Sequence, residues 1–409
     1  MTPPTGPALL RGHDSYRRLV ALAAEGHARG RDPFLASEPD VALARLYCHA
    51  FRRHVIGAFH ATRRALAACP GVTGPAAEGV ARADESLADL ANRSMDPVGD
   101  DARALLSTFH HYATHVERVV AALATACDRS GDGALALVQE RFVAEMEAIT
   151  TGNGIAVVRD DHVPVQGSFV VPNLGITIVP LVYGDHHSWN LAWLDGPRSD
   201  VPCHRHRDGV EIHLGFAPLH GHTILGNARA EVTEGYAMPI PAGTRHGYAN
   251  LDGRVHHVPF IFGSLALGGW GVFLDVDAEP TDPTTLPVED LGEGEFRHTV
   301  FLDREIEAAK HAPDAPRRTV VPASSTDRRG TGGIELGVSA AQHRPLVVGR
   351  ESFRAISVVQ GRGRLRIAGA EAAVGPRDHV GVPAGLPATI EPEGGEVLVV
   401  LDALLRRVT

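Results

Sequence analysis

The stretch VPCHRHRDGVE, residues 201–211, contains two histidines, His204 and His206, that are two residues apart. Because successive side chains of a β-strand point to opposite faces, this spacing places both imidazoles on one face of an extended segment. Asp208-Gly209 is typical of a hairpin turn, so the chain is expected to reverse there. The reversal would bring Glu211 back beside the histidine pair.

A second turn is predicted at Pro241-Ala242-Gly243, immediately before His246. Three imidazoles and one carboxylate from adjacent antiparallel strands would then converge on one point. Nitrogen and carboxylate donors in this combination are typical of a first-row transition-metal site. The candidate metal ligands are therefore His204, His206, Glu211 and His246.

These segments resemble the two defining motifs of the cupin superfamily. The second motif is complete, with Gly235, Pro241, Gly243, His246 and Asn250. The first motif keeps its ligand positions and departs only in its framing glycines, since Gly196 lies two residues too far upstream and position 218 is Pro. The resemblance implies a jelly-roll β-barrel that holds a metal ion.

The rest of the chain predicts an α+β protein with three parts. Residues 1–150 read as an all-α domain, whose clearest helix has apolar residues at steps of three and four: Leu105, Phe109, Tyr112, Val116, Val119 and Leu123. Beyond Gly152-Asn153-Gly154, short apolar runs separated by turn residues predict a metal-binding cupin barrel at 151–285. Residues 286–409 are expected to form a connecting segment and a second cupin-like barrel, which makes the chain a bicupin.

The second barrel is expected to lack a metal site. Val382-Pro383-Ala384-Gly385 repeats the turn that precedes His246, but Ala388 stands at the position equivalent to that histidine. No His-x-His pair precedes it either. The second unit is therefore expected to be structural, with one metal ion per chain bound in the first barrel.

Bulk composition limits the function classes. The 409 residues carry a formal net charge of −10, which argues against nucleic-acid and anionic-membrane surfaces. The four cysteines show neither paired nor metal-like spacing, and the sequence begins without a signal-peptide pattern. We expect a cytoplasmic protein with reduced thiols that acts on a small molecule and forms a homodimer.

Two residues near the ligands are candidates for proton handling. His213 lies two residues after Glu211, and Tyr248 lies two residues after His246, so both are expected on the barrel-facing side. The alternatives are a core histidine satisfied by a neighbour and a packing tyrosine with a tethered hydroxyl. Cys203 and Arg205 alternate with the ligand histidines and are expected to point away from the pocket.

Three functions fit this ligand set. The favoured hypothesis is a mononuclear non-haem oxygenase that binds Fe(II) and uses O₂ on a small polar metabolite. The alternative is a metal-dependent sugar or uronate isomerase, or a lyase, and a further alternative is a non-enzymatic cupin that binds a small ligand. Mn, Ni, Cu and Zn also suit three histidines and one glutamate, because affinity alone does not select among these metals.

Overall fold

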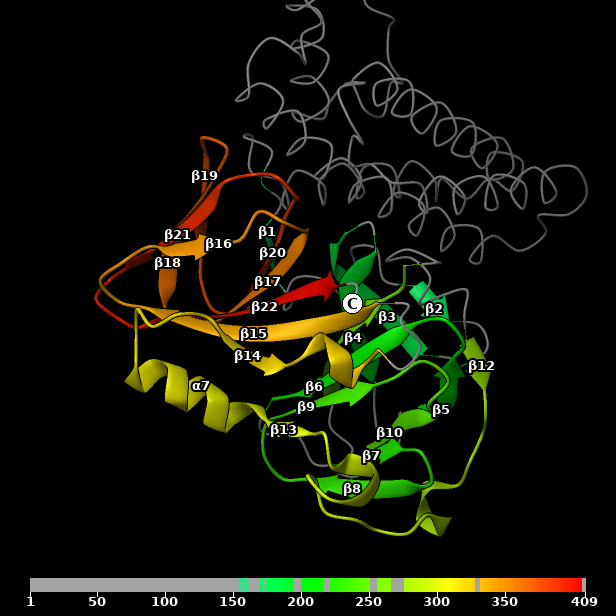
Figure 1. Ribbon diagram of the computed structural model, residues 1–409. Coiled ribbons are helices and arrows are strands. Elements are labelled where there is room, and N and C mark those ends of the chain that lie inside the picture. Colours follow the sequence, from blue (N-terminus) through cyan, green and yellow to red (C-terminus); the bar gives the residue numbers. More distant parts are fainter. Residues whose placement is uncertain are drawn as a thin grey trace, which may run out of the picture.

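The computed structural model describes a β-rich protein from residue 155 onward. The described residues are 155, 157–159, 169–171, 174, 176–184, 186–194, 200–216, 221–250, 256–265, 276–327 and 332–406. They form four antiparallel sheets and, within these ranges, a single α-helix (Figure 1). The predicted all-α domain of residues 1–150 lies outside the described residues.

The first unit is a sandwich of a seven-stranded and a five-stranded sheet. The seven-stranded sheet has the order β13-β9-β6-β11-β4-β3-β2. Its strands are β2 (Phe169–Val171), β3 (Ile176–Tyr183), β4 (His187–Leu194), β6 (Val210–Gly215), β9 (Tyr236–Ile240), β11 (His256–Gly263) and β13 (Val300–Phe301). The five-stranded sheet has the order β12-β5-β10-β7-β8. Its strands are β5 (Val201–His206), β7 (Gly221–Leu225), β8 (Ala228–Val232), β10 (His246–Asn250) and β12 (Val276–Ala278).

The second unit repeats this plan with fewer strands. A six-stranded sheet, ordered β1-β20-β17-β22-β15-β14, lies against a four-stranded sheet, ordered β16-β21-β18-β19. The six strands are β1 (Val157–Arg159), β14 (Arg318–Val321), β15 (Gly333–Ala341), β17 (Arg354–Gln360), β20 (Asp378–Val382) and β22 (Leu398–Arg406). The four strands are β16 (Leu346–Val348), β18 (Arg362–Ile367), β19 (Ala370–Val374) and β21 (Ala388–Glu393).

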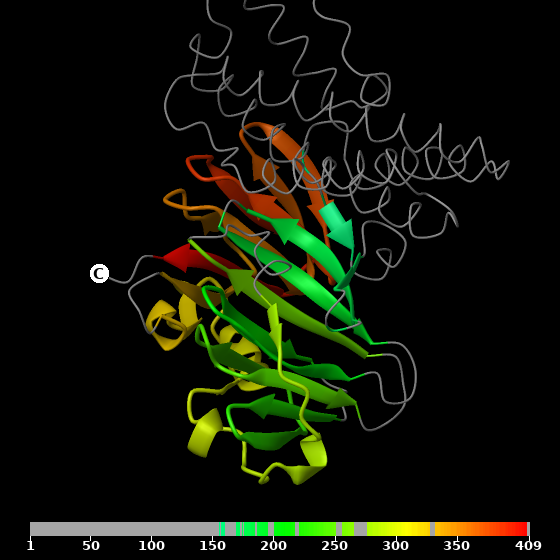
Figure 2. The ribbon, with the colours of Figure 1, turned by 90° about the vertical axis from the view of Figure 1, so that its right-hand side faces the viewer.

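The two sandwiches pack through their larger sheets, which gives four layers of sheet (Figure 2). Strand β6 shows the consequence, because all six of its residues are buried. Val210, Ile212 and Leu214 belong to the core between the two sandwiches, together with residues of β15, β17 and β22. The alternate residues of β6, which include Glu211 and His213, face the interior of the first sandwich. A strand buried on both faces therefore delivers two side chains to the first interior.

The two units exchange a strand at equivalent positions. Strand β1, which precedes the first unit in the chain, pairs with β20 of the second. Strand β13, which precedes the second unit, pairs with β9 of the first. The predicted range 151–285 for the first unit thus includes a strand whose neighbour lies in the second unit, and the first unit gains a strand from beyond residue 285.

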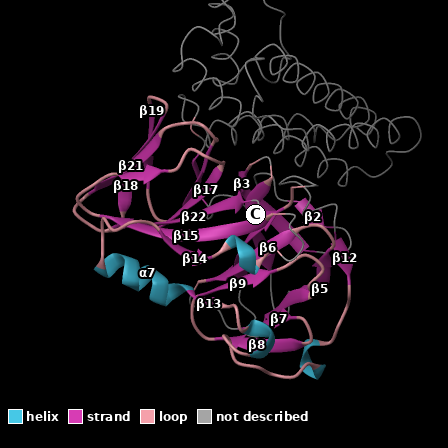
Figure 3. Cartoon of the chain, viewed as in Figure 1, coloured by secondary structure: helices cyan, strands magenta, loops and turns pink. Residues whose placement is uncertain are grey.

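The connection between the units ends in helix α7 (Leu302–His311). The 3₁₀ turn Gly294–Phe296 precedes this helix, and Gly294 has a φ of 47° there. Leu302, Ile306 and Ala309 form one buried stripe of α7 that joins the core between the sandwiches. Figure 3 shows α7 beside β14. None of the helices in the described ranges has the length and apolarity needed to cross a membrane.

Truncating a side chain in the core between the sandwiches tests this packing. Val338 on β15 is 0% exposed, and we expect Val338→Ala to lower the free energy of unfolding by about 2 kcal/mol because it leaves a cavity. Val347 is 81% exposed, and Val347→Ala is a matched control that we expect to change stability by less than about 0.5 kcal/mol. Urea unfolding measures both. Equal effects of the two variants would contradict the buried interface.

Candidate metal centre

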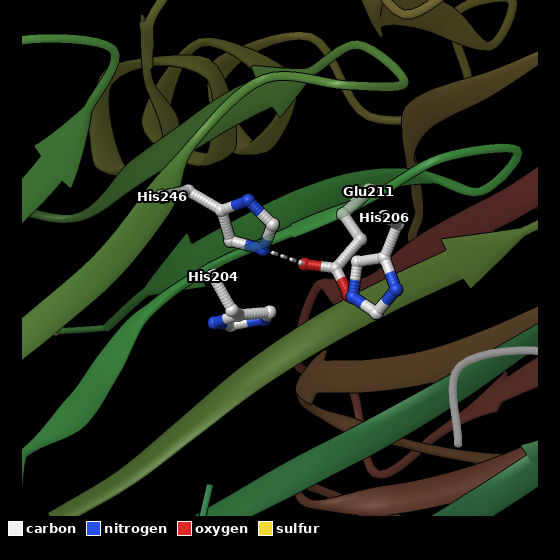
Figure 4. Close-up of side chains that lie close together, drawn as sticks. All are labelled: His204, His206, Glu211 and His246. Carbon is white, nitrogen blue, oxygen red and sulfur yellow. Dashed lines mark ion pairs between the residues drawn. The ribbon is translucent and has the colours of Figure 1, made fainter. Parts of the chain in front are cut away.

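Three histidines reach the centre from two neighbouring strands of the five-stranded sheet. His204 and His206 lie on β5, and His246 begins β10 directly opposite His204. The pairing of β5 and β10 is irregular between the pair His246–His204 and the pair Tyr248–Val201. The side chains of Val201, His204 and His206 therefore all line the same cavity. The ring centroids of His204 and His246 lie 4.2 Å apart. Figure 4 shows the three imidazoles turned toward one another and toward Glu211.

Glu211 reaches the same point from the opposite sheet. The sequence predicted a hairpin at Asp208-Gly209 with Glu211 on a strand adjacent to the histidines, and this detail is wrong. The chain does reverse there, but β5 and β6 belong to the two facing sheets and do not pair with each other. Residues 207–209 therefore form an arch across the sandwich. The four ligand atoms still lie within 4.8 Å of one another, as the ligand prediction required.

The turn before His246 is fixed by a backbone requirement. Gly243 has a φ of 77°, and the Thr244 N–H donates to the Pro241 carbonyl at 3.0 Å, which is the geometry of a type II turn. A side chain at Gly243 would strain this backbone. The Gly243 N–H also donates to the His206 carbonyl at 2.6 Å. The turn therefore connects the strand of His246 to the strand of His206.

The ring of Phe262 lies close to Gly209 and packs against His206. A Cβ added to Gly209 would lie 2.1 Å from the Phe262 ring, so only glycine leaves room for this phenylalanine. The ring of Phe262 meets that of His206 edge to face, with centroids 5.1 Å apart. Phe262 was not predicted as part of the site. Alternation along β11 could have placed its side chain on the ligand-facing side of the strand, where Phe262 pairs directly with Glu211.

Backbone carbonyls set the orientation of two ligand histidines. His204 Nδ1–H donates to the Pro202 carbonyl at 2.9 Å, and His246 Nδ1–H donates to the Thr244 carbonyl at 2.9 Å. A carbonyl oxygen only accepts hydrogen bonds, so Nδ1 carries the proton in both rings. In their neutral forms, both rings therefore offer the Nε2 lone pair as the metal donor.

The ionisation states suit a metal-binding site. Burial lowers the pKa of His204 well below its usual value, and the neighbouring imidazoles of His246 and His206 lower it further. Burial also lowers the pKa of His246. For Glu211, burial alone would raise the pKa, but the adjacent His206 and His246 hold it well below the usual range of a carboxyl group. Burial thus disfavours the charged form of His204 and His246, and the adjacent imidazoles favour the charged form of Glu211.

This arrangement of donor atoms favours a bound cation. His246 Nε2 lies 3.0 Å from Glu211 Oε2, and His206 Nε2 lies 3.0 Å from Glu211 Oε1. When His246 is neutral, both atoms of its pair carry lone pairs, and Nε2 has no well-formed hydrogen bond within the described part of the chain. Burial disfavours a proton on this ring, so a divalent metal ion is the cation that fits the donor set.

His213 lies beside the ligands and contacts one of them. Its Nε2 donates to Glu211 Oε2 at 3.0 Å, and its ring centroid lies 5.1 Å from that of His246. The hydrogen bond helps to orient the carboxylate, at the same oxygen that lies 3.0 Å from His246 Nε2. His213 also lines the cavity described below. The structure therefore brings His213 to the metal centre, although its predicted catalytic role remains a prediction.

Tyr248 lies away from this centre. Its side chain is fully buried in the apolar core of the first sandwich, and its hydroxyl occupies the space beside Gly221 where a side chain would otherwise lie. Tyr248 is not among the described residues that line the cavity. Cys203 and Arg205 also do not line it, and Arg205 forms an ion pair with Glu279.

A cavity opens beside the ligands, and about 400 Å³ of space free of protein atoms lies there, part of it open solvent. The seven-stranded sheet contributes Ile176, Ile178, Ala192, Val258 and Phe260 to its wall. Leu174 and, from the five-stranded sheet, Val201 and Val276 complete the apolar lining. The polar side chains among its described lining are His213 and the ligands His204, His206 and Glu211. This apolar lining differs from the site for a small polar metabolite that the sequence analysis expected.

The second sandwich carries an ion pair where the first carries a metal ligand. Glu211 pairs with Ile240 before the turn in the first unit, and Arg354 pairs with Val382 at the equivalent place in the second. Arg354 Nη1 donates to Asp402 Oδ2 at 2.5 Å, and both residues are buried. Ala388 begins β21 as His246 begins β10. Among the described residues, the one group that could hold a metal ion is that of the first sandwich.

Comparisons with known proteins show distant likeness only. No protein-family model matches the sequence, and no curated protein matches it. Salicylate 1,2-dioxygenase from Pseudoaminobacter salicylatoxidans, solved with gentisate, is similar with a TM-score of 0.43 and 15% identity, over 53% of this chain and 68% of that chain. An oxalate decarboxylase mutant from Bacillus subtilis has a TM-score of 0.40 and 12% identity, over 59% and 78% of the two chains.

A cupin 2 conserved barrel domain protein from Leptotrichia buccalis has a TM-score of 0.38 and 10% identity, over 56% of this chain and 89% of that chain. Similarity at this level leaves the function to be inferred from the residues of the chain itself.

Removal of one ligand tests the metal centre. His246→Ala deletes one of the four donors, and we expect the affinity for a divalent metal to fall by more than about 100-fold. Competition with a coloured chelator measures the affinity, and elemental analysis measures the bound metal. His343→Ala, which changes an exposed histidine of the second unit, is the matched control. Unchanged affinity in His246→Ala would refute the ligand set.

The lowered pKa values predict acid sensitivity of the metal-free protein. His204, His246 and Glu211 all take up protons less readily in the folded chain than in the unfolded chain. The stability they contribute is therefore complete above about pH 6.5, the ordinary histidine pKa, and is lost as the pH falls. We expect a lower urea midpoint at about pH 5.5 than at about pH 7.5, and a smaller difference in His204→Gln. A higher midpoint at the acidic pH would contradict this assignment.

Proposed function

We propose that this chain is a mononuclear non-haem metal-dependent oxygenase, with Fe(II) held by His204, His206, Glu211 and His246. The observation that supports it most is the position of this donor set, which is buried and forms one end of an apolar cavity. Four protein donors leave one or two positions open on a five- or six-coordinate ion. An open position beside a cavity is what a substrate or O₂ requires.

A bound Fe(II) ion would supply the electrons and the open coordination positions that the reaction of O₂ needs. The protein supplies the surroundings. O₂ is itself apolar, and the residues Ile178, Val258 and Phe260 provide an apolar wall beside the donor set. Apolar surroundings also strengthen the electrostatic interactions at the metal centre.

The role proposed for His213 follows from its hydrogen bond. His213 Nε2–H donates to Glu211 Oε2, which holds the carboxylate plane and tunes its strength as a ligand. We assign to His213 the positioning of Glu211 and the holding of a proton at Nε2 during the reaction. No such role is assigned to Tyr248, because its hydroxyl is buried beside Gly221.

The alternatives have less support from the same cavity. A sugar or uronate isomerase needs side chains that bind hydroxyl and carboxylate groups of its substrate. Apart from the ligands and His213, the described lining offers none. A binding protein without catalytic activity would not need a complete and buried donor set. The cytoplasmic location and the homodimer stay predictions from the sequence.

Nitric oxide binding tests the proposal without knowledge of the substrate. The metal-free protein is loaded anaerobically with Fe(II), and nitric oxide is added as a stand-in for O₂. We expect the EPR signal of a high-spin non-haem iron nitrosyl, because a four-donor site leaves a position open for a diatomic ligand. Oxygen-electrode measurements with candidate substrates then follow oxygen uptake.

His343→Ala should give the same signal as the unmodified chain, whereas His206→Ala should give none. Tight binding of zinc that iron cannot replace, together with no nitrosyl signal, would refute the oxygenase assignment.

A further inference from the structure

The wall of the cavity contains a continuous apolar row across three strands. Ala192 on β4 pairs with Ile178 on β3 and with Val258 on β11, so these three side chains lie side by side on one face of the sheet. Phe260 follows two residues closer to the metal centre along β11, directly opposite His213. At roughly 3.3 Å per residue, Val258 lies about 13 Å along the strand from the level of Phe262 and Glu211.

Charged groups in the described lining are confined to the metal end. Neither Arg nor Lys occurs among the described residues of the lining, and Glu211 is its sole carboxylate. A carboxylate or phosphate that lies against this wall would therefore find no charged partner among the described lining residues. Burial of an unpaired charge is strongly unfavourable.

The second sandwich shows that the fold can place charge in its interior. Phe260 pairs with His213, and the equivalent pair in the second unit is Asp402 with Ile356. The buried Asp402 binds Arg354 and Arg317 there. In the metal-binding unit the same strand position carries a phenylalanine ring, which leaves the cavity wall uncharged at that level.

From this distribution we propose that the substrate has one polar head that binds at the metal and an uncharged, apolar body that lies along Phe260 and the row Ile178, Ala192 and Val258. The proposal rests on the proposed function in one respect, since the metal fixes where the head lies. The body buries apolar surface against this row, and that burial supplies binding energy.

A matched pair of chelators tests the substrate class independently of turnover. Octanohydroxamate and suberic acid monohydroxamate share a metal-binding head and a chain of the same carbon count, but the tail of the second ends in a carboxylate. Their binding to the Mn(II)-loaded protein is measured by calorimetry. We expect octanohydroxamate to bind at least about tenfold more tightly, because the other tail must lose its hydration without gaining a partner.

Substitutions in the row give the controls. Ile178→Lys places a cation beside the tail, and we expect the preference to shrink or reverse, whereas Ile178→Leu should keep it. Equal binding of the two chelators, or tighter binding of the carboxylate form, would overturn the substrate class while leaving the metal centre intact. A protein that retains no Mn(II) would overturn both this inference and the proposed function.

Discussion

Strand β6 is buried on both faces, and the position of the metal centre depends on this double burial. Val210, Ile212 and Leu214 lie in the core between the two sandwiches, while Glu211 and His213 face the first interior. A slip of one residue would exchange the two sets. Glu211 would then enter the apolar core between the sandwiches without a partner, which is strongly unfavourable. The second sandwich therefore fixes the register of the carboxylate ligand.

The candidate ligands come from two sheets that are otherwise held together by apolar packing. The three histidines belong to the five-stranded sheet and Glu211 to the seven-stranded sheet, across a separation of about 10 Å. A bound ion would link the sheets, and it would stabilise the folded chain by about 4 kcal/mol at a concentration 1,000 times its dissociation constant. In the second sandwich, Arg354 and Asp402 come from strands of the same sheet, so their ion pair does not replace such a link.

The sequence allowed the ligands to be predicted because their spacing is local. His204 and His206 share a face by strand alternation, and the turn at Gly243 is readable from its residues alone. Alternation also placed His213 on the cavity side. For Tyr248 the same reasoning was insufficient, because it predicts the face of a strand but not the depth of a side chain within the core.

Other features depend on contacts between distant segments and could not be predicted. A reversal at Asp208-Gly209 is compatible both with a hairpin and with an arch between sheets, and the pairing of β6 with the distant strands β9 and β11 distinguishes them. The exchange of β1 and β13 pairs residues far apart in the chain. The apolar row of the cavity likewise comes from three strands between residues 178 and 258, none of which carries a distinctive motif.

The charge of the proposed centre adds a condition on what binds there. A divalent ion held by neutral histidines and one carboxylate would keep a net charge of +1, since Glu211 is the one anion among the described ligands. In a site walled by apolar side chains this charge is weakly screened, so an anionic donor atom at the open position is favoured. The same weak screening penalises any second charge beside Ile178 or Val258. The centre and its wall therefore select for a ligand whose ionisable group lies entirely at one end.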